Sequence, residues 1–322
     1  MLKRQFSGKL KEYLEGFLRE KRTLGFSYST GADVLNQFDK FCIEKFGLEM
    51  TITPELGLAW ATKRSNEKMT TLEGRVCVVR ELARYMNRCG IEAFVIPKGI
   101  ARTGVRFTPH IFTKDELTKF FAVLDTMERN PTAPIQHIMF PVLFRLLYSC
   151  GLRPLEAVTL ASKNIDLKTG VLFIEQSKGH ADRNVVVSDD MLRMLRNYRK
   201  KVCTAVALDP YFFPNMQGGQ LLTSNLNRVF RKCWIAAKIP DPYGNPPRVY
   251  DFRHSFATKR LFQWHEAGND VNALLPYLSA YMGHAHLSAT AYYIHLTPEF
   301  FPKEKLQGLQ SFDDLIPEVS YD

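Results

Sequence analysis

Paired cysteines are absent from this 322-residue chain, although it contains six cysteines. They stand at positions 42, 77, 89, 150, 203 and 233, and no two of them form a C-x-x-C pair. Structural zinc sites and the disulfide frameworks of secreted proteins need closely spaced or paired cysteines. We therefore expect reduced, mostly buried thiols, and the cysteine pattern argues against a zinc centre and against a disulfide-stapled fold.

Long apolar runs are also missing. The longest, IMFPVLFRLLYSCG at 138–151, is broken by Arg145 and is shorter than the roughly 20 residues that a membrane-spanning helix needs. The first residues, MLKRQFSGKLKEYLEGF, become charged before an apolar run develops, unlike a signal peptide. The sequence therefore predicts a cytoplasmic protein without a membrane segment.

Acidic residues are fewer than basic ones. Asp and Glu number 33 against 43 Lys and Arg, which gives a net charge of +10. The acids form no carboxylate cluster and no set of metal ligands is visible, so we predict neither a metal nor another cofactor. Excess positive charge favours a polyanionic partner, nucleic acid or an anionic membrane surface. Without a membrane segment, nucleic acid is the favoured partner.

Residues 1–97 show the apolar spacing of helices, and we predict a helical domain there. Ser29 or Thr30 is expected to cap the second helix. The expected helices cover 10–25, 29–47, 53–64 and 70–89. In the last of these, Arg80, Arg84 and Arg88 recur every four residues and therefore share one face. That face is either an ordinary solvated surface or a surface that contacts DNA.

A short basic segment follows the helical domain. Residues 98–110, KGIARTGVRFTPH, hold two glycines, one proline, four basic residues and no acid. We interpret the segment as an interdomain linker that runs along phosphates, with Arg102 and Arg106 as DNA contacts.

Residues 111–322 are predicted to form a second domain. Thr113 and Glu116 have the spacing of a capping box. Between 165 and 188, β-branched runs separated by KTG and KGHADR indicate a small antiparallel sheet. Further helices are expected at about 189–202, 224–237, 250–264 and 271–282. The expected fold is thus mainly α: a helical N-terminal domain, then a mixed α+β domain with a small antiparallel sheet.

Two segments of this second domain carry arginines in distinctive contexts. In CGLRPLEAVTL, residues 150–160, Arg153 follows a glycine helix stop and precedes Glu156 by three residues. In VYDFRHSFATKR, residues 249–260, Arg253 and His254 lie inside an amphipathic helix. Taken alone, the first arginine is an ordinary surface residue paired with a glutamate.

Two further segments carry a lysine, histidines and tyrosines. QSKGHADR, residues 176–183, places Lys178 at a hairpin turn. GHAHLSATAYYIHLTPE, residues 283–299, holds His284 and the adjacent pair Tyr292 and Tyr293. Taken alone, the lysine is a solvated turn residue and each tyrosine is a half-buried helix aromatic.

In this order, the four segments resemble the motifs of the tyrosine recombinase (phage integrase) family. T-G-x-R-x-x-E-x-x-x-L resembles CGLRPLEAVTL, with Cys150 for threonine, and G-K-G-x-x-x-R-x-V-P resembles SKGHADRNVVV, with Ser177 for glycine. H-D-L-R-H-x-x-A-T resembles YDFRHSFAT, with Tyr250 for histidine. L-G-H-x-x-x-x-x-T-x-x-Y-x-H resembles MGHAHLSATAYYIH, with Met282 for leucine.

The last motif distinguishes the two tyrosines. Tyr293 follows His284 by nine residues, which is the family spacing, and Tyr292 is then its neighbour. The resemblance covers about residues 1–318. It implies a two-domain layout like that of the Xer recombinases, with a core-binding domain before the catalytic domain.

The resemblance also implies roles at a DNA phosphodiester. Arg153 and Arg253 would clamp the non-bridging oxygens, because a guanidinium offers two N–H groups to such oxygens. His284 would donate to a phosphoryl oxygen. Glu156 would orient a neighbouring donor. Tyr250, at a position where the family usually has histidine, would be a further donor to the phosphate.

The remaining implied roles concern the nucleophile and the leaving group. Tyr293 would attack the phosphorus, and Lys178 on its hairpin would protonate the leaving 5′ oxygen as a general acid. The product would be a 3′-phosphotyrosine, which conserves the bond energy, so rejoining needs neither ATP nor a metal.

The predicted function is therefore site-specific DNA recombination, for mobile-element integration and excision or for chromosome and plasmid resolution. A type IB-like topoisomerase and a DNA-binding protein that has lost its activity remain alternatives, the latter because Tyr250 departs from the pattern. The expected partners are a double-stranded recombination site, three further copies in a tetramer on synapsed DNA, and an accessory DNA-bending or directionality factor. An apolar helix at about 302–318 would dock on a neighbouring protomer or on its own domain.

Overall fold

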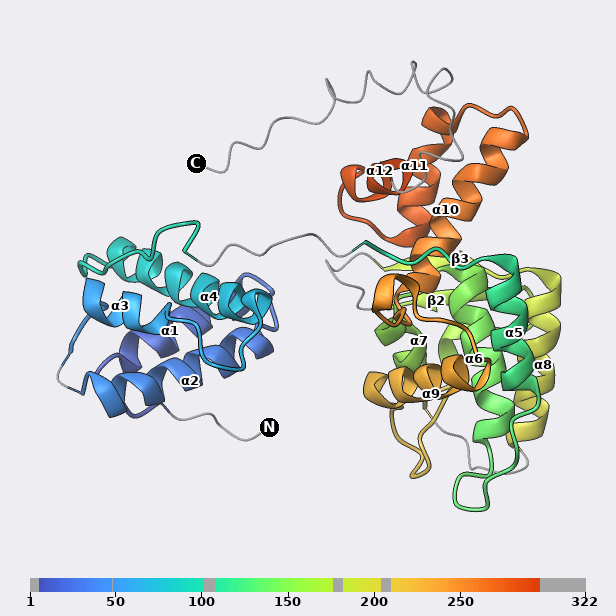
Figure 1. The fold of residues 1–322 in the computed structure, drawn as a ribbon, viewed down its shortest axis with the longest axis horizontal. Coiled ribbons are helices and arrows are strands. Elements are labelled where there is room, and N and C mark those ends of the chain that lie inside the picture. Colours follow the sequence, from blue (N-terminus) through green and yellow to red (C-terminus); the bar gives the residue numbers. More distant parts are fainter. Residues whose placement is uncertain (1–5, 48, 101–107, 176–181, 204–209, 296–322) are drawn as a thin grey trace. The chain divides into compact units, whose positions relative to one another are not determined.

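The computed structural model describes residues 6–47, 49–100, 108–175, 182–203 and 210–295. The chain divides into two compact units, Met1–Phe107 and Thr108–Asp322 (Figure 1). Four predictions fall outside the described residues: the DNA contacts Arg102 and Arg106, the hairpin Lys178, and the tail helix at 302–318.

The first unit consists of helices packed around one apolar core. They are α1 (Lys11–Thr23), α2 (Ser29–Lys45), α3 (Pro54–Trp60) and α4 (Met69–Arg88). Leu14, Phe38 and Val79 are buried in this core, and the ring of Phe38 meets the ring of Trp60 edge-on at 5.1 Å between centroids. The expected helical domain is therefore present, with its apolar residues at the helical spacing that the sequence shows.

Two predicted helix boundaries in the first unit are wrong. Neither Ser29 nor Thr30 caps α2, because Tyr28 occupies the N-cap in a left-handed conformation and the helix already begins at Ser29. The third helix ends at Trp60 rather than near 64. The guanidinium of Arg75 donates to the carbonyl oxygens of Trp60 and Thr62. These bonds hold the chain in a non-helical path after Trp60.

The second unit is a helical assembly beside one small sheet. Its elements are α5 (Lys114–Asp125), α6 (Gln136–Cys150), α7 (Pro154–Thr159), η1 (Ser162–Asn164), β1 (Ile165–Asp166), β2 (Val171–Ile174), β3 (Arg183–Val186), α8 (Asp189–Cys203), α9 (Thr223–Ala236), η2 (Pro242–Gly244), α10 (Asp251–Glu266), α11 (Val271–Met282) and α12 (Ser288–His295). The strands pair antiparallel in the order β1-β2-β3, with Leu172 opposite Val185. The prediction of a mainly α fold with a small antiparallel sheet is confirmed.

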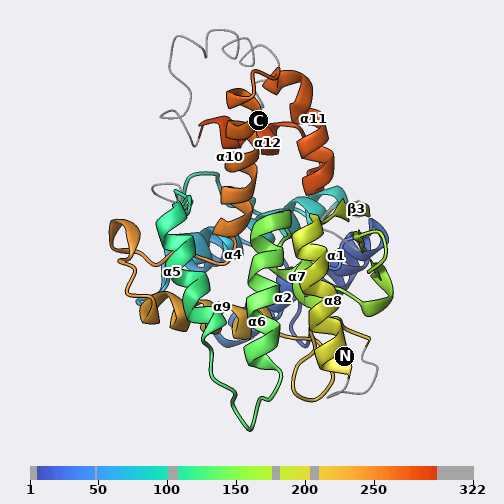
Figure 2. The same ribbon diagram turned by 90° about the vertical axis from the view of Figure 1, so that its right-hand side faces the viewer.

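Helix α6 forms the centre of the second unit. Phe140 and Leu147 on one face and Val142 and Leu146 on another are all buried. Helix α10 packs on α6 at one end and on α11 and α12 at the other, so that α10, α11 and α12 form one end of the unit (Figure 2). The core thereby fixes the first turn of α10 relative to the end of α6.

Two glycines and one capping box set the helix boundaries that matter for the site. Thr113 and Glu116 form the predicted capping box at the start of α5. Gly151 ends α6 with φ of 59°, and Gly283 ends α11 with φ of 65°. Such left-handed positions favour glycine, which has no Cβ to clash. Among the described residues, no helix combines the length and the apolar character needed to span a membrane.

Candidate active site

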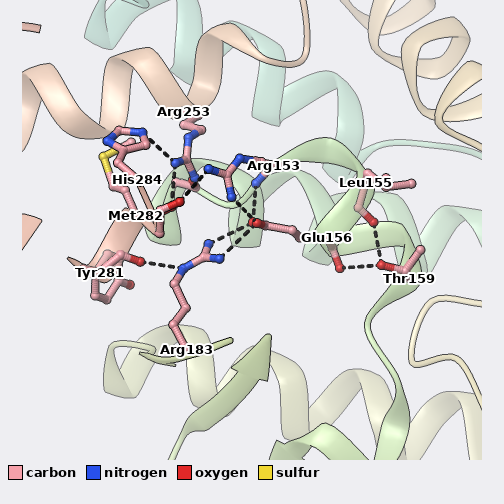
Figure 3. A network of polar contacts seen from close by, with 11 residues as sticks. Arg153, Leu155, Glu156, Thr159, Arg183, Arg253, Tyr281, Met282 and His284 are labelled. Atoms are coloured by element: carbon pink, nitrogen blue, oxygen red, sulfur yellow. Dashed lines mark hydrogen bonds and ion pairs between the residues drawn. The ribbon is translucent and has the colours of Figure 1, made fainter. Parts of the chain in front are cut away.

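Polar side chains from three elements meet at the junction of α7, α10 and α11 (Figure 3). Arg153 is the N-cap of α7, Arg253 lies in the first turn of α10, and His284 follows the glycine that ends α11. The sequence places these residues up to 131 positions apart. The fold brings Arg253 into hydrogen-bond contact with His284, and Arg153 into contact with the carbonyl of the neighbouring Gly283.

Arg153 is held by its own helix and by the end of α11. Its Nη1 donates to Glu156 Oε1 at 2.6 Å, and its Nη2 donates to the Gly283 carbonyl oxygen at 2.7 Å. The backbone N–H of Arg153 donates to Glu156 Oε2 at 2.9 Å. The side chain is 16% exposed, so its guanidinium is fixed while part of it still faces solvent.

Arg253 is fully buried. Its Nη1 donates to the Gly151 carbonyl oxygen at 2.8 Å, and its Nη2 donates to the Met282 carbonyl oxygen at 2.6 Å. Its Nε is buried and meets no hydrogen-bond acceptor within the described part of the chain. Burial lowers the pKa of this guanidinium, and the positive charge of Arg153 lowers it further. The site therefore holds a cation that is short of acceptors, which an anionic ligand would supply.

The hydrogen bonds of His284 define its tautomer. Its Nε2 lies 2.9 Å from Arg253 Nη2, and because arginine only donates, Nε2 must accept. Nδ1 then carries the proton and donates to Thr290 Oγ1 at 2.7 Å. Burial, followed by the nearby Arg253, lowers the pKa of His284 to about 4. The imidazole is therefore neutral near pH 7.

Tyr293 lies in α12 and is 3% exposed. Its ring stacks on His284 at 6.0 Å between centroids and lies 5.5 Å from the ring of His254. Burial raises the pKa of Tyr293 to about 12, although the charge of Arg253 acts in the opposite direction. Tyr292 is only half-buried and faces Tyr293 with its ring edge, at 6.0 Å.

Tyr250 stands directly before α10 and is 36% exposed. The centroid of its ring lies 5.1 Å from that of His254. Its phenol acts to raise the pKa values of both Arg253 and Tyr293. His254 is 9% exposed, and its Nδ1 is buried without a hydrogen-bond partner among the described residues. The ring of His254 thus lies between the rings of Tyr250 and Tyr293 and contacts both.

Sequence reasoning missed one member of this cluster, Arg183, the first residue of β3. Its Nη1 and Nη2 donate to the two oxygens of Glu156 at 3.0 and 2.8 Å. Burial acts to raise the pKa of Glu156, but the ion pairs with Arg183 and Arg153 outweigh it and hold the pKa below its ordinary value. The signal was present, because Arg183 is the arginine of the segment that matched the hairpin motif.

The other predicted site residues are Lys178 and the arginines of the first unit. Lys178 lies outside the described residues. On α4, Arg80 donates to the carbonyl oxygens of Ile96 and Pro97, and Arg88 pairs with Glu20 at 2.8 Å, whereas Arg84 is exposed. Within the described part of the chain, no three His, Cys, Asp or Glu side chains gather in a way that could hold a metal ion.

The buried His254 gives a testable pH dependence. Burial lowers its folded pKa to about 4, whereas a histidine in the unfolded chain titrates near 6.5. Below about pH 6.5 the unfolded state binds a proton that the folded state does not bind, so stability must fall as the pH drops towards 4. The expected loss from this residue is at most about 3 kcal/mol.

Urea unfolding of the full chain between pH 7 and 4 measures this effect. His254→Gln should flatten the pH dependence of the unfolding free energy relative to the wild type, because only the variant lacks this proton uptake. His284, whose pKa is lowered in the same direction, remains in both proteins and cancels in the difference. Equal pH slopes for the two proteins would contradict the assigned burial of a neutral imidazole.

The known proteins that resemble this chain in sequence are named as integrases and recombinases. The sequence profile of the family described as "Phage integrase family" matches residues 110–299. A protein of Sinorhizobium fredii, y4rB, named as an integrase/recombinase, is 31% identical over 313 residues, which cover 93% of this chain and 96% of that protein. The tyrosine recombinase XerC of Halalkalibacterium halodurans is 27% identical over 71% of this chain and 72% of its own.

Solved structures share the fold at low sequence identity. The XerH site-specific recombinase bound to a palindromic difH substrate, in a post-cleavage complex, matches with a TM-score of 0.62 and 20% identity over 94% of this chain and 84% of that one. The Tn1549 transposon integrase in complex with transposon right end DNA matches with a TM-score of 0.64 and 12% identity over 94% and 98%.

Proposed function

Because the chain belongs to the phage integrase family of tyrosine-type, site-specific DNA recombinases, we propose that it cleaves and rejoins DNA strands through a covalent 3′-phosphotyrosine at Tyr293. The observation that supports this most is the contact network that joins Arg153, Arg253 and His284 beside the ring of Tyr293. Side chains from three separate elements converge there on one small space.

The two arginines suit a phosphodiester in the geometry that the site offers. Arg253 is rigidly held by the carbonyls of Gly151 and Met282, so its guanidinium is ordered before a substrate arrives. Arg153 is held on two sides but keeps a partly open face. Donors fixed in advance stabilise charge that develops in a transition state without a cost of reorganisation. We assign both arginines to the non-bridging phosphate oxygens.

Tyr293 is the nucleophile in this proposal. The attack joins its phenolic oxygen to the phosphorus, the bond to the leaving 5′ oxygen breaks, and the phenolic proton must be lost. Its pKa of about 12, raised by burial, makes the phenolate scarce near pH 7. The buried phenol therefore needs the positive charge of the arginines and the bound phosphate beside it before attack. Lys178 is proposed as the acid for the leaving oxygen.

DNA is the proposed substrate, as double-stranded recombination sites. Of the solved structures with this fold, XerH is described as bound to a difH substrate and the Tn1549 integrase as in complex with transposon right end DNA. The chain's net charge of +10 supports such a partner. The proposed phosphate contacts are Arg80, Arg84, Arg88, Arg102 and Arg106, of which Arg84 is exposed on α4. Synapsis of two sites is proposed to use a tetramer.

A nicked suicide substrate tests the proposal. It should trap a covalent protein–DNA adduct with the wild-type chain, since loss of a short fragment prevents rejoining. The adduct should form equally with EDTA, because guanidiniums supply the positive charge at the phosphate. A chain that binds the duplex and forms no adduct would be a binding protein that has lost its activity, and Mg²⁺-dependent cleavage would contradict the assigned chemistry.

Replacing Tyr250 tests the donor assigned to this position. Tyr250→Phe removes one hydroxyl and keeps the ring that packs on His254 at 5.1 Å. Losing one donor to a charged phosphate costs about 1–3 kcal/mol, so cleavage should slow about 10- to 100-fold. Tyr250→His should be tolerated. Single-turnover cleavage of the nicked substrate measures both variants, and a wild-type rate for Tyr250→Phe would mean that Tyr250 only packs.

A further inference from the structure

Three consecutive carbonyl oxygens at the end of α11 each accept a hydrogen bond from a different arginine (Figure 3). The three bonds join Arg183 Nε to Tyr281 (2.7 Å), Arg253 Nη2 to Met282 (2.6 Å) and Arg153 Nη2 to Gly283 (2.7 Å). The last carbonyls of a helix lack partners within the helix and carry its negative dipole end. The end of α11 therefore gathers three cations.

Two of these arginines are the proposed phosphate clamp, and the third, Arg183, has no role in it. Arg183 is 9% exposed and donates through all three of its nitrogens. Two of these bonds occupy both oxygens of Glu156, at 3.0 and 2.8 Å. Arg183 thus connects β3, α7 and the end of α11 through one buried guanidinium.

Arg183 and Arg153 share the carboxylate of Glu156. That carboxylate also accepts from Arg153 Nη1 at 2.6 Å and from the Arg153 backbone N–H at 2.9 Å. With four donors, its acceptor sites are filled. Without Arg183, each oxygen of Glu156 would have a vacant acceptor site. The guanidinium of Arg153 could then bind both oxygens, and such a bidentate pair would rotate it towards Glu156. Arg183 therefore keeps Arg153 in its present orientation.

The charge balance points the same way. Arg153, Arg183 and Arg253 contribute three positive charges, Glu156 contributes one negative charge, and His284 is neutral because its Nε2 accepts from Arg253. Within this group of five side chains, Arg183 neutralises the carboxylate. The charges of Arg153 and Arg253 then remain for an anion.

The side chain of Arg183 packs directly against Gly283, where a Cβ would have no room. A Cβ at position 283 would lie 2.9 Å from Arg183 Nη1 and 3.0 Å from its Cδ. The guanidinium thus fills the space beneath the turn that leads into His284. A displaced Arg183 would disturb both Glu156 and this turn.

We propose that Arg183 is a positioning residue for DNA cleavage: it does not touch the scissile phosphate, and it acts through Glu156 to hold Arg153 in the orientation that clamps the phosphate. This inference rests on the proposed function. It requires that loss of Arg183 slow the cleavage step itself, with little effect on binding of the duplex.

Arg183→Lys in the full chain tests the proposal. A lysine keeps the charge but cannot span both oxygens of Glu156 and also reach the Tyr281 carbonyl. Affinity for the nicked duplex should be unchanged, whereas the single-turnover rate at saturating DNA should fall about 100-fold, as expected when a reacting group is misplaced by about 1 Å. A role in stability alone would lower the melting temperature and leave this rate unchanged.

A double variant provides a second test if Arg183→Lys folds poorly. Arg183→Met with Glu156→Gln removes both members of the pair, so neither member stays buried without the other. Because Arg183 acts through Glu156, the double variant should cleave as fast as Glu156→Gln alone. A further loss beyond that of Glu156→Gln would overturn the proposal.

Arg75→Lys is the matched control, because Arg75 forms a similarly buried pair with Glu67 in the first unit, with both side chains 5% exposed. It should lower stability and leave the rate at saturating DNA unchanged. Wild-type rates for Arg183→Lys overturn this inference alone. Absence of adduct from the wild type overturns the proposed function, and this inference with it.

Discussion

Tyr293→Phe is expected to abolish the covalent protein–DNA adduct, because the variant lacks the only atom that can form the phosphotyrosine bond at this position. DNA affinity should stay at the wild-type level, since the ring that stacks on His284 and lies against His254 is kept. The adduct is measured by denaturing gel on a nicked substrate, and the affinity by a mobility shift on the intact duplex.

Tyr292→Phe is the matched control, one residue away in the same helix. Tyr292 is half-buried, whereas Tyr293 is almost fully buried against His254 and His284. This variant should form adduct at close to the wild-type rate. If Tyr292→Phe loses the adduct and Tyr293→Phe keeps it, the assignment of the nucleophile is reversed.

Arg253→Lys should reduce the single-turnover cleavage rate about 100- to 1000-fold, which is the usual cost of removing one preorganised donor at developing charge. Lysine offers one point charge where arginine offers a planar fork. It cannot satisfy the carbonyls of Gly151 and Met282 and also donate to His284, as Arg253 does. Melting temperature should fall as well, because buried acceptors lose their donors.

The stability loss has to be separated from the loss of rate. Arg145→Lys serves as control, because Arg145 makes a two-bond pair with Asp125 at 2.8 and 2.6 Å in the same unit and lies outside the candidate site. This variant should keep the wild-type rate. Near-wild-type cleavage by Arg253→Lys at saturating DNA would show that Arg253 supports the fold without binding the phosphate.

The family resemblance grouped the candidate site residues, and the structure brings Arg153, Arg253, His284 and Tyr293 together, whereas Lys178 lies outside the described residues. Some helix boundaries, in contrast, follow from short local signals. Arg153 follows a glycine stop and precedes a proline, and the structure shows a helix end at Gly151 and a helix start at Pro154. The periodic apolar residues and the alternating β-branched runs likewise predicted the helices and the small antiparallel sheet. Local sequence rules were sufficient for these features.

Features that depend on long-range packing could not be predicted in the same way. No local signal indicates that the carbonyls at the end of α11 receive arginines from β3, α7 and α10, because this depends on how four elements pack. Arg183 was therefore missed, although it stands in a matched motif. The failed cap at Ser29 has a local cause, because Tyr28 adopts a left-handed conformation that is rare for a bulky residue.

Peptide mapping of the trapped adduct tests the central claim most directly. After cleavage of the nicked substrate, the chain is digested with protease and nuclease, and fragmentation mass spectrometry locates the residue that carries the nucleotide. We predict a 3′-phosphate of DNA on the phenolic oxygen of Tyr293. A nucleotide on Tyr292, a 5′-linked phosphate, or no modified tyrosine in a preparation that binds the duplex would contradict the account.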